Sequence, residues 1–333
     1  MAIRVVVVGL GPRGRDWVRQ IQSDPAFQLV AAVDIDRDVL QQTASLGIPA
    51  ANSFPTLDEA LDRTSCDAVI VATTVGQHEE ACLTAIAHRL AMLVEKPFTM
   101  HLDTALRLVC AAEEKGLPLI VGQNHRYLRS WRTVHRLIAE DVLGRLGLVT
   151  CHYYRPPHRM AAALASLENN VLWGYGVHQL DALRYVLSQR ITRVSADLFS
   201  RPQIVKGASM QAILMFEEGT RAVVTASYES SGHEFFERGQ EFYARFVGDR
   251  ATLHVFQRWL FLCEGRKLPR PIARGARREP EERLLLRQLA RAILHGEQPD
   301  CSGRDNLQTM AAVEACVRSS AERRWINPQE LLP

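Results

Sequence analysis

The sequence predicts a two-domain α/β protein, with a parallel sheet in the first domain and a large, mostly antiparallel sheet in an α+β second domain. Through about residue 121, apolar runs alternate with helical patterns, and the short connections between them indicate right-handed βαβ crossovers. After residue 122, strand-like segments are joined by turns alone, which excludes parallel crossovers. The length of 333 residues also fits two domains, which we place at 1–121 and 122–333.

The first domain opens with the β-branched run 3–8, which is typical of a strand buried on both faces of a parallel sheet. Further strands are expected at 28–33, 68–72, 92–94 and 119–121. Helical patterns occupy 15–23, 37–46, 57–62, 78–88 and 102–114. Gly or Asp-Pro follows several of these patterns, as expected where a helix ends.

In the second domain, helices are expected at 129–140, 177–187, 281–294 and 304–322. Strands are expected at 192–199, 210–216, 222–228, 241–247, 252–256 and 259–263, with glycine-containing turns between several of them. Residues 264–280 are rich in Arg, Pro and Gly, and we interpret them as a solvated basic loop.

Composition excludes several classes of protein. The formal net charge of +3 gives no argument for nucleic acid or a membrane surface as partner, and no stretch approaches the roughly 18 apolar residues of a membrane helix. The first apolar run is too short for a secretory signal. Seven scattered cysteines, without a CxxC pair, predict reduced thiols in a cytoplasmic protein and no metal site.

A glycine motif, Gly9-Leu10-Gly11-Pro12-Arg13-Gly14, follows the first strand directly and opens the first helix. In that position it predicts a dinucleotide-binding Rossmann domain. Gly9 permits the tight turn, Gly11 lets the backbone approach the pyrophosphate, and Gly14 lets helix and strand pack closely. The helix N-terminus then presents N–H groups and a partial positive charge to the anion.

Asp34, at the end of the second strand, stands about 20 residues beyond the last of these glycines. We expect it to accept hydrogen bonds from the adenosine ribose hydroxyls. Because its charge would repel a 2′-phosphate, NAD is favoured over NADP. Arg13 is the opposing signal, since its guanidinium could pair with that phosphate, and NADP stays the alternative.

Four further elements follow in order: 69–73 through His78, Val94-Glu95-Lys96-Pro97, 121–127, and Gly176-Val177-His178-Gln179-Leu180-Asp181. Together with the glycine motif they resemble the Gfo/Idh/MocA family, the glucose–fructose oxidoreductase and inositol dehydrogenase superfamily. The resemblance implies an NAD(P)-dependent dehydrogenase or reductase. It would transfer a hydride between nicotinamide and a small polar substrate, such as a sugar, a polyol or a derivative.

The resemblance also implies site residues. It makes Lys96 and His178 the catalytic pair that handles the substrate proton, and it implies a cis Lys96–Pro97 bond. The reaction requires groups that can accept a proton, because oxidising an alcohol releases a proton to a base within hydrogen-bond reach. A lysine partly desolvated beside a cationic nicotinamide has a lowered pKa, and His178 is its natural partner.

The remaining candidates complete the predicted site. Asp181 falls near the same helix face as His178, so we expect it to orient that histidine or contact the substrate. Tyr175 and Tyr154 are expected to line the substrate pocket, with core packing as the alternative. The predicted cofactor-binding residues are Gly9, Gly11, Pro12, Arg13, Gly14, Asp34, Thr73, His78, Glu95 and Lys96.

The chain departs from the family pattern at Gly174, where many family dehydrogenases carry an Asp four residues before the motif histidine. Three alternatives therefore stay open: an imine reductase, a non-catalytic nucleotide-sensing regulator, and an NAD-dependent glycosidase. Retention of Lys96 and His178 argues against the regulator. The resemblance also implies a homodimer or homotetramer in which a second subunit covers one face of the second sheet, and the apolar alternation in 210–228 fits that arrangement.

Overall fold

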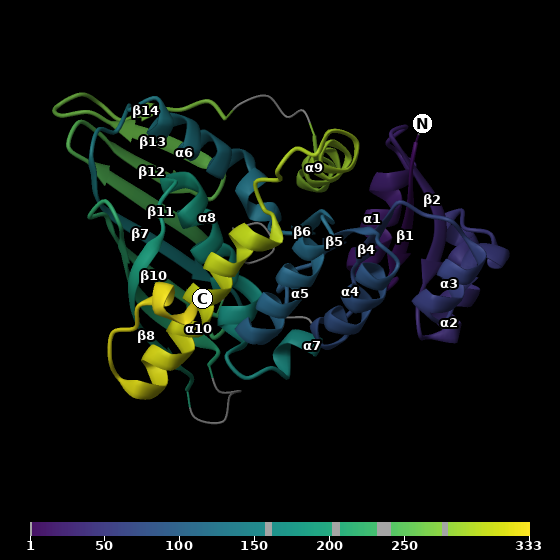
Figure 1. The fold of residues 1–333 in the computed structure, drawn as a ribbon. Coiled ribbons are helices and arrows are strands. Elements are labelled where there is room, and N and C mark those ends of the chain that lie inside the picture. Colours follow the sequence, from purple (N-terminus) through teal and green to yellow (C-terminus); the bar gives the residue numbers. More distant parts are fainter. Residues whose placement is uncertain (1, 157–161, 202–206, 232–240, 275–278) are drawn as a thin grey trace. The chain divides into compact units, whose positions relative to one another are not determined.

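The computed structural model describes residues 2–156, 162–201, 207–231, 241–274 and 279–333 (Figure 1). The chain forms two compact units. The first contains Met1–Asn124 and Glu279–Leu307, and the second contains His125–Arg278 and Gln308–Pro333. No helix in the described part of the chain has the length and apolar character of a membrane span.

The first unit is built on a six-stranded parallel sheet in the order β3-β2-β1-β4-β5-β6. The order reverses between β1 and β4, and in doubly wound sheets ligands bind at that point, beyond the carboxyl ends of the strands. The strands are β1 (Ile3–Val8), β2 (Phe27–Val33), β3 (Ser53–Phe54), β4 (Ala68–Val71), β5 (Ala91–Val94) and β6 (Leu119–Val121). The helices between them are α1 (Pro12–Gln22), α2 (Arg37–Gln41), α3 (Leu57–Arg63), α4 (His78–Ala87) and α5 (Leu102–Glu114).

The core of this unit lies along β1, β4 and β5, whose residues are almost all buried. Runs of Val, Ile and Leu without alternation suit such strands, because helices cover both faces of a parallel sheet. The Rossmann sheet predicted from the sequence is therefore confirmed.

A late segment of the chain completes the first unit, which departs from the single predicted division at 121/122. The N–H of Val121 donates to the carbonyl of Cys301 at 2.9 Å, and Ser302 forms an antiparallel bridge with Ile120. These contacts cover the outer edge of β6, whose other edge pairs with β5. The segment also contains α9 (Glu281–His295) and the start of α10 (Gly303–Glu322).

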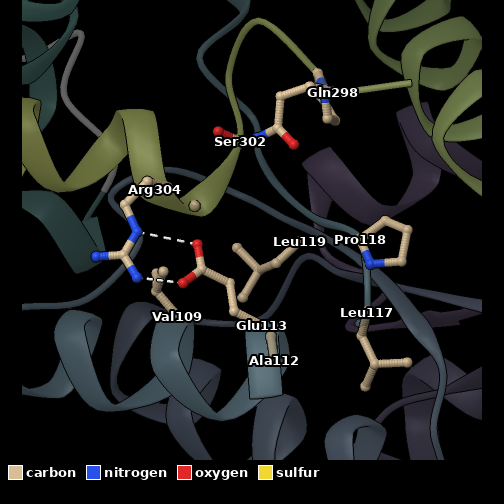
Figure 2. A pocket seen from close by; sticks show the side chains of 11 residues that line it. Val109, Ala112, Glu113, Leu117, Pro118, Leu119, Gln298, Ser302 and Arg304 are labelled. Carbon is tan, nitrogen blue, oxygen red and sulfur yellow. Dashed lines mark hydrogen bonds and ion pairs between the residues drawn. The ribbon is translucent and has the colours of Figure 1, made fainter. Parts of the chain in front are cut away.

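Figure 2 shows how this segment lies against α5 and β6. Arg304 forms an ion pair with Glu113, with Nε 3.0 Å from Oε1, beside a cavity of about 80 Å³. A Cβ at Gly303 would lie 2.7 Å from the side chain of Leu119, so the glycine allows α10 to begin close to β6. Within the described chain, the lining includes none of the predicted site residues, so this cavity is not the candidate active site.

The second unit contains an eight-stranded sheet in the order β14-β13-β12-β11-β7-β10-β9-β8. All its pairs are antiparallel except β10 with β7, which confirms the mostly antiparallel sheet. The strands are β7 (Leu146–Tyr154), β8 (Ile191–Phe199), β9 (Ser209–Phe216), β10 (Arg221–Ser227), β11 (Glu241–Gly248), β12 (Thr252–Phe256), β13 (Trp259–Cys263) and β14 (Arg270–Pro271). The helices are α6 (Arg129–Ala139), the short α7 (Ala162–Ala165), α8 (Val177–Leu187) and the rest of α10.

The two faces of this sheet differ. On one face α6 and α8 cover it (Figure 1). There the ring of Trp131 in α6 packs against that of Phe246 in β11. On the other face apolar side chains remain uncovered, and Leu148, Ile213 and Trp259 are 41%, 43% and 55% exposed. We call this second surface the open face of the sheet.

Candidate active site

The turn after β1 has the geometry that its glycines predict. Gly9 has a φ of +89°, and a Cβ there would lie 2.7 Å from the backbone nitrogen of Thr73. A Cβ on Gly14 would collide with the carbonyl oxygen of Gly9, so α1 can lie this close only with glycine. At Gly11 no described protein atom lies within 4 Å of an added Cβ. The loop thus combines a tight turn with an open backbone surface of the kind a pyrophosphate needs.

The surroundings of this loop fit a dinucleotide. A cavity of about 490 Å³ opens at Leu10–Pro12 and is bounded by one side of α1 and by Val39 of α2. Asp34, at the end of β2, accepts the N–H of Leu10 at 2.7 Å through Oδ2 and that of Asp36 at 2.9 Å through Oδ1. These two bonds fix a carboxylate beside the glycine loop, where an adenosine ribose would lie.

Arg13 is held by two carboxylates. Its Nη2 lies 2.6 Å from Oε1 of Glu95, and its Nη1 lies 2.9 Å from Oε1 of Glu282 on α9. Pairing with a 2′-phosphate would compete with both ion pairs. The signal that favoured NADP in the sequence is therefore opposed by the structure.

His78 is buried at the start of α4. Its Nδ1 lies 3.0 Å from the carbonyl oxygen of Phe98, and its Nε2 lies 3.3 Å from that of Thr73. Burial lowers the pKa of His78 despite these hydrogen bonds. The ring thus ties the end of β4 to the segment after Lys96.

Lys96 directly follows β5 and Glu95. The Lys96–Pro97 bond is cis, as the resemblance implies. Burial lowers the pKa of Lys96, the charge of Glu95 opposes this shift, and the charge of Arg13 adds to it. A lysine amine with a lowered pKa is the group that proton transfer at a substrate hydroxyl needs.

In the second unit, His178 occupies the first turn of α8 and is buried. Its ring stacks on that of His125, with centroids 3.7 Å apart. Tyr175 meets His125 edge-on at 5.9 Å and stacks on Tyr153 at 3.3 Å. The structure thus brings Tyr175 and His178 together around His125. The one sequence signal for His125 is its position within the motif 121–127.

Asp181 forms hydrogen bonds with buried side chains of the second unit. Its side chain is fully buried, and Arg126 donates two hydrogen bonds to it, each of 2.6 Å. Thr309 donates a third at 2.9 Å, and Arg184 donates to Thr309. Since Arg126 follows His125 directly, Asp181 joins the His125 segment to α8. The described contacts of Asp181 thus hold the segment at Arg126 against α8 and α10.

Tyr154 lies apart from the other candidates of this unit. Cys151 contacts Gln179 of α8 and Tyr153 stacks on Tyr175, so these two side chains lie on the covered face of β7. Tyr154 alternates with them and contacts Thr225 at 3.1 Å. It therefore lies on the open face, and the structure does not bring it together with His178 and Tyr175.

Gly174 lies in a π-helical turn, Leu172–Gly176, just before α8. A Cβ at this position would meet the hydroxyl of Tyr228 and the side chain of Leu164. Tyr228 is buried, and burial raises the pKa of its hydroxyl. An aspartate in this slot would therefore require the side chains of Tyr228 and Leu164 to move.

Two family models match the sequence. A model described as an oxidoreductase family with an NAD-binding Rossmann fold matches residues 3–123. A second, for the Gfo/Idh/MocA C-terminal domain, matches residues 131–254. The two matches follow one another along the chain and together span more than half of it.

Several named proteins are similar to this chain. An inositol 2-dehydrogenase from an Arthrobacter species is 32% identical over 199 residues, which cover 59% of this chain and 57% of that relative. A D-apiose dehydrogenase from Paraburkholderia graminis is 26% identical over 347 residues, covering 98% of this chain and 89% of the relative. The crystal structure of an oxidoreductase from Agrobacterium radiobacter, in complex with NAD+, L-tartaric acid and magnesium, shares the fold. Its TM-score is 0.86 at 21% identity, with both chains fully covered.

Proposed function

Because the chain belongs to the Gfo/Idh/MocA family of NAD-binding oxidoreductases, we propose that it is a dehydrogenase or reductase acting on a sugar, a polyol or a derivative. One observation carries the proposal. In a single unit, the open glycine loop and Lys96, whose pKa is lowered, both lie at the carboxyl ends of the strands. That is the edge of the sheet at which such folds act. The inositol and apiose dehydrogenases among the relatives supply the substrate class.

We propose NAD rather than NADP as the cofactor. The Asp34 carboxylate is fixed beside the loop and would repel a 2′-phosphate. Arg13, the cation that the sequence offered to such a phosphate, is engaged by Glu95 and Glu282. Thr73 and His78 line the end of β4, which supports their place near the cofactor.

When bound, the nicotinamide supplies the hydride acceptor or donor, and the protein handles the proton. In oxidation the neutral amine of Lys96 accepts the hydroxyl proton, and in reduction its ammonium form donates one. For His178 we propose hydrogen bonding to the substrate or a share in proton transfer, with Tyr175 as a neighbouring contact. Asp181 acts through Arg126 on the His125 segment.

We further propose a cytoplasmic homodimer or homotetramer that assembles through the open face of the second sheet. Leu148, Ile213 and Trp259 expose apolar surface there, and such surface favours association. The cytoplasmic location rests on the seven free cysteines. A strict monomer by light scattering at micromolar concentration would contradict the oligomer.

The first experiment is a titration of the purified protein with NADH and with NADPH, followed by energy transfer from its tryptophans. Tight binding of NADH and weak binding of NADPH are expected. NAD-coupled oxidation of inositols, polyols and aldoses is then screened, with ring imines and glycosides as the alternative substrates. Binding of neither nucleotide would overturn the proposal and favour the regulator, and glycoside cleavage without net change in NAD would favour the glycosidase.

A further inference from the structure

Arg13 and Trp17, one turn apart on α1, share one acceptor. Oε1 of Glu95 accepts hydrogen bonds from Nε and Nη2 of Arg13, at 3.0 and 2.6 Å, and from Nε1 of Trp17 at 2.9 Å. Its Oε2 accepts the backbone N–H of Lys96 at 3.2 Å. Glu95 is 5% exposed and Trp17 is fully buried, so a well-bonded carboxylate lies out of water directly before Lys96.

The charges of this cluster act on Lys96. A lone carboxylate at Glu95 would favour the ammonium form of its neighbour, because opposite charges attract strongly where water is excluded. The guanidinium of Arg13 offsets part of that effect, since Glu95 raises the pKa of Lys96 and Arg13 lowers it. Glu282 holds the other edge of the same guanidinium at 2.9 Å, which fixes its orientation toward Glu95.

Other ionisable groups of the first unit lie near the cluster. Asp16 is 3.9 Å from Nη1 of Arg13 and is half-exposed, so water screens it. His78 is buried and directed at the carbonyls of Phe98 and Thr73, and its lowered pKa favours the neutral ring. Within the described residues of this unit, the charge of Glu95 raises the pKa of Lys96 and the charge of Arg13 lowers it.

We propose that Arg13 is a positioning residue for proton transfer, which neutralises Glu95 and thereby keeps the Lys96 amine able to accept a proton. The inference rests on the proposed function for the role of Lys96. In this role Arg13 acts on Glu95 and Lys96, and it does not need to contact a phosphate of the cofactor.

The test measures the Lys96 amine directly and needs no turnover. Lysines stand only at positions 96, 115, 206 and 267, so reductive methylation with ¹³C-formaldehyde gives few NMR signals, and Lys96→Met assigns one of them. The signal is titrated with pH in the protein without nucleotide. Arg13→Gln is expected to raise the pKa of Lys96 by about one unit or more, because Glu95 loses its cation. Arg13→Lys keeps the charge and is expected to restore most of the original value.

Two further variants separate charge from folding damage. Arg13→Gln combined with Glu95→Gln removes both charges and is expected to return the pKa of Lys96 toward that of the unmodified chain. Arg4→Gln breaks a comparable ion pair, with Asp67 at the other end of β1, and is expected to leave Lys96 unchanged. Thermal melting by circular dichroism shows which variants are folded.

An unchanged Lys96 pKa in folded Arg13→Gln would overturn the inference. If that variant does not fold, Glu95→Gln gives the same test with the opposite sign, because loss of the carboxylate is expected to lower the pKa of Lys96. A chain that oxidises no polyol or sugar would defeat the proposed function, while the NMR titration would still decide the role of Arg13.

Discussion

The imidazole rings of His125 and His178 lie face to face, with centroids 3.7 Å apart and planes 9° from parallel. The rings come from the turn after β6 and from the first turn of α8. Arg126, the residue after His125, forms an ion pair with Asp181 of α8, and this pair joins the same two segments. A stacked aromatic pair is worth about 0.5–1.5 kcal/mol, so each ring limits the orientations open to the other.

Replacement of His125 is therefore expected to act on turnover. His125→Ala removes the ring that supports His178 and is expected to lower kcat/KM by up to about tenfold, which corresponds to ~1.4 kcal/mol. His125→Phe keeps a flat ring and is expected to retain most of the activity. Steady-state kinetics check this prediction, and NADH binding by both variants is expected to be unchanged. Equal losses in the two variants would mean that the imidazole itself contacts the substrate.

Breaking the buried ion pair is expected to destabilise the second unit. Arg126→Met leaves the Asp181 carboxylate buried with its cation gone, which costs about 3–5 kcal/mol. Arg250→Met is the matched control, since its ion pair with Asp141 is exposed on both sides and such pairs are worth about 0–1 kcal/mol. Urea unfolding measures the free energy of unfolding of each variant. Similar small losses would count against a structural role for the Arg126–Asp181 pair.

Lys96→Met is expected to abolish most turnover and to weaken NADH binding far less. Loss of a general acid or base lowers rates by roughly 10²–10⁴-fold. Lys115→Met, at an exposed position on the same unit, is expected to behave as the unmodified chain. The comparison needs kcat for NAD-coupled oxidation and the Kd for NADH. A Lys96→Met enzyme with near-normal kcat would remove Lys96 from the mechanism.

The pH profile follows from the direction of the Lys96 shift. Oxidation needs the neutral amine, so its rate is expected to rise with pH through the pKa of Lys96 and then level off. Reduction needs the ammonium form, so its rate is expected to fall through the same pKa. Because that pKa lies below the ordinary 10.5, the change should appear at lower pH than for an unperturbed lysine. If the rates of oxidation and of reduction both rose, or both fell, with pH, Lys96 could not be the proton carrier in both reactions.

Alanine substitutions at Gly14 and at Gly11 of the loop are expected to have different effects. Gly14→Ala forces a Cβ into the Gly9 carbonyl and is expected to lower the melting temperature. Gly11→Ala meets no described protein atom and is expected to fold normally, yet to bind NADH at least about tenfold more weakly, because the Cβ occupies the pyrophosphate position. Gly147→Ala, also in open space but in the second unit, serves as the control. Unweakened NADH binding by Gly11→Ala would move the cofactor away from this loop.

Much of the fold of the first unit could be predicted because the sequence patterns that indicate it are local. The β-branched run of β1, the glycine spacing and the carboxylate at Asp34 all lie within about 30 residues and need no tertiary information. The strand β3 was missed, because Ser53–Phe54 is too short to show any periodicity. The expected helix at 37–46 is an α-helix only to Gln41, followed by a 3₁₀ turn at Thr43–Leu46.

The contacts that were missed join distant parts of the chain. The face on which Tyr154 lies depends on strand register, and a shift of one residue exchanges the two faces. Likewise, the pairing of Asp181 with Arg126 joins positions 55 residues apart, and no local pattern indicates it. Helical spacing suggested His178 as the partner of Asp181, whereas the buried guanidinium of Arg126 offered a stronger one.

The late segment that covers β6 has a consequence for synthesis. Residues 1–124 leave the ribosome before Cys301 and Ser302, and until those two residues have been made the outer edge of β6, at Ile120 and Val121, lacks its partners. Until then the nascent sheet ends in an unsatisfied strand, and such edges recruit other chains. A polypeptide stalled before Cys301 is thus expected to depend on chaperones far more than the chain of 333 residues does.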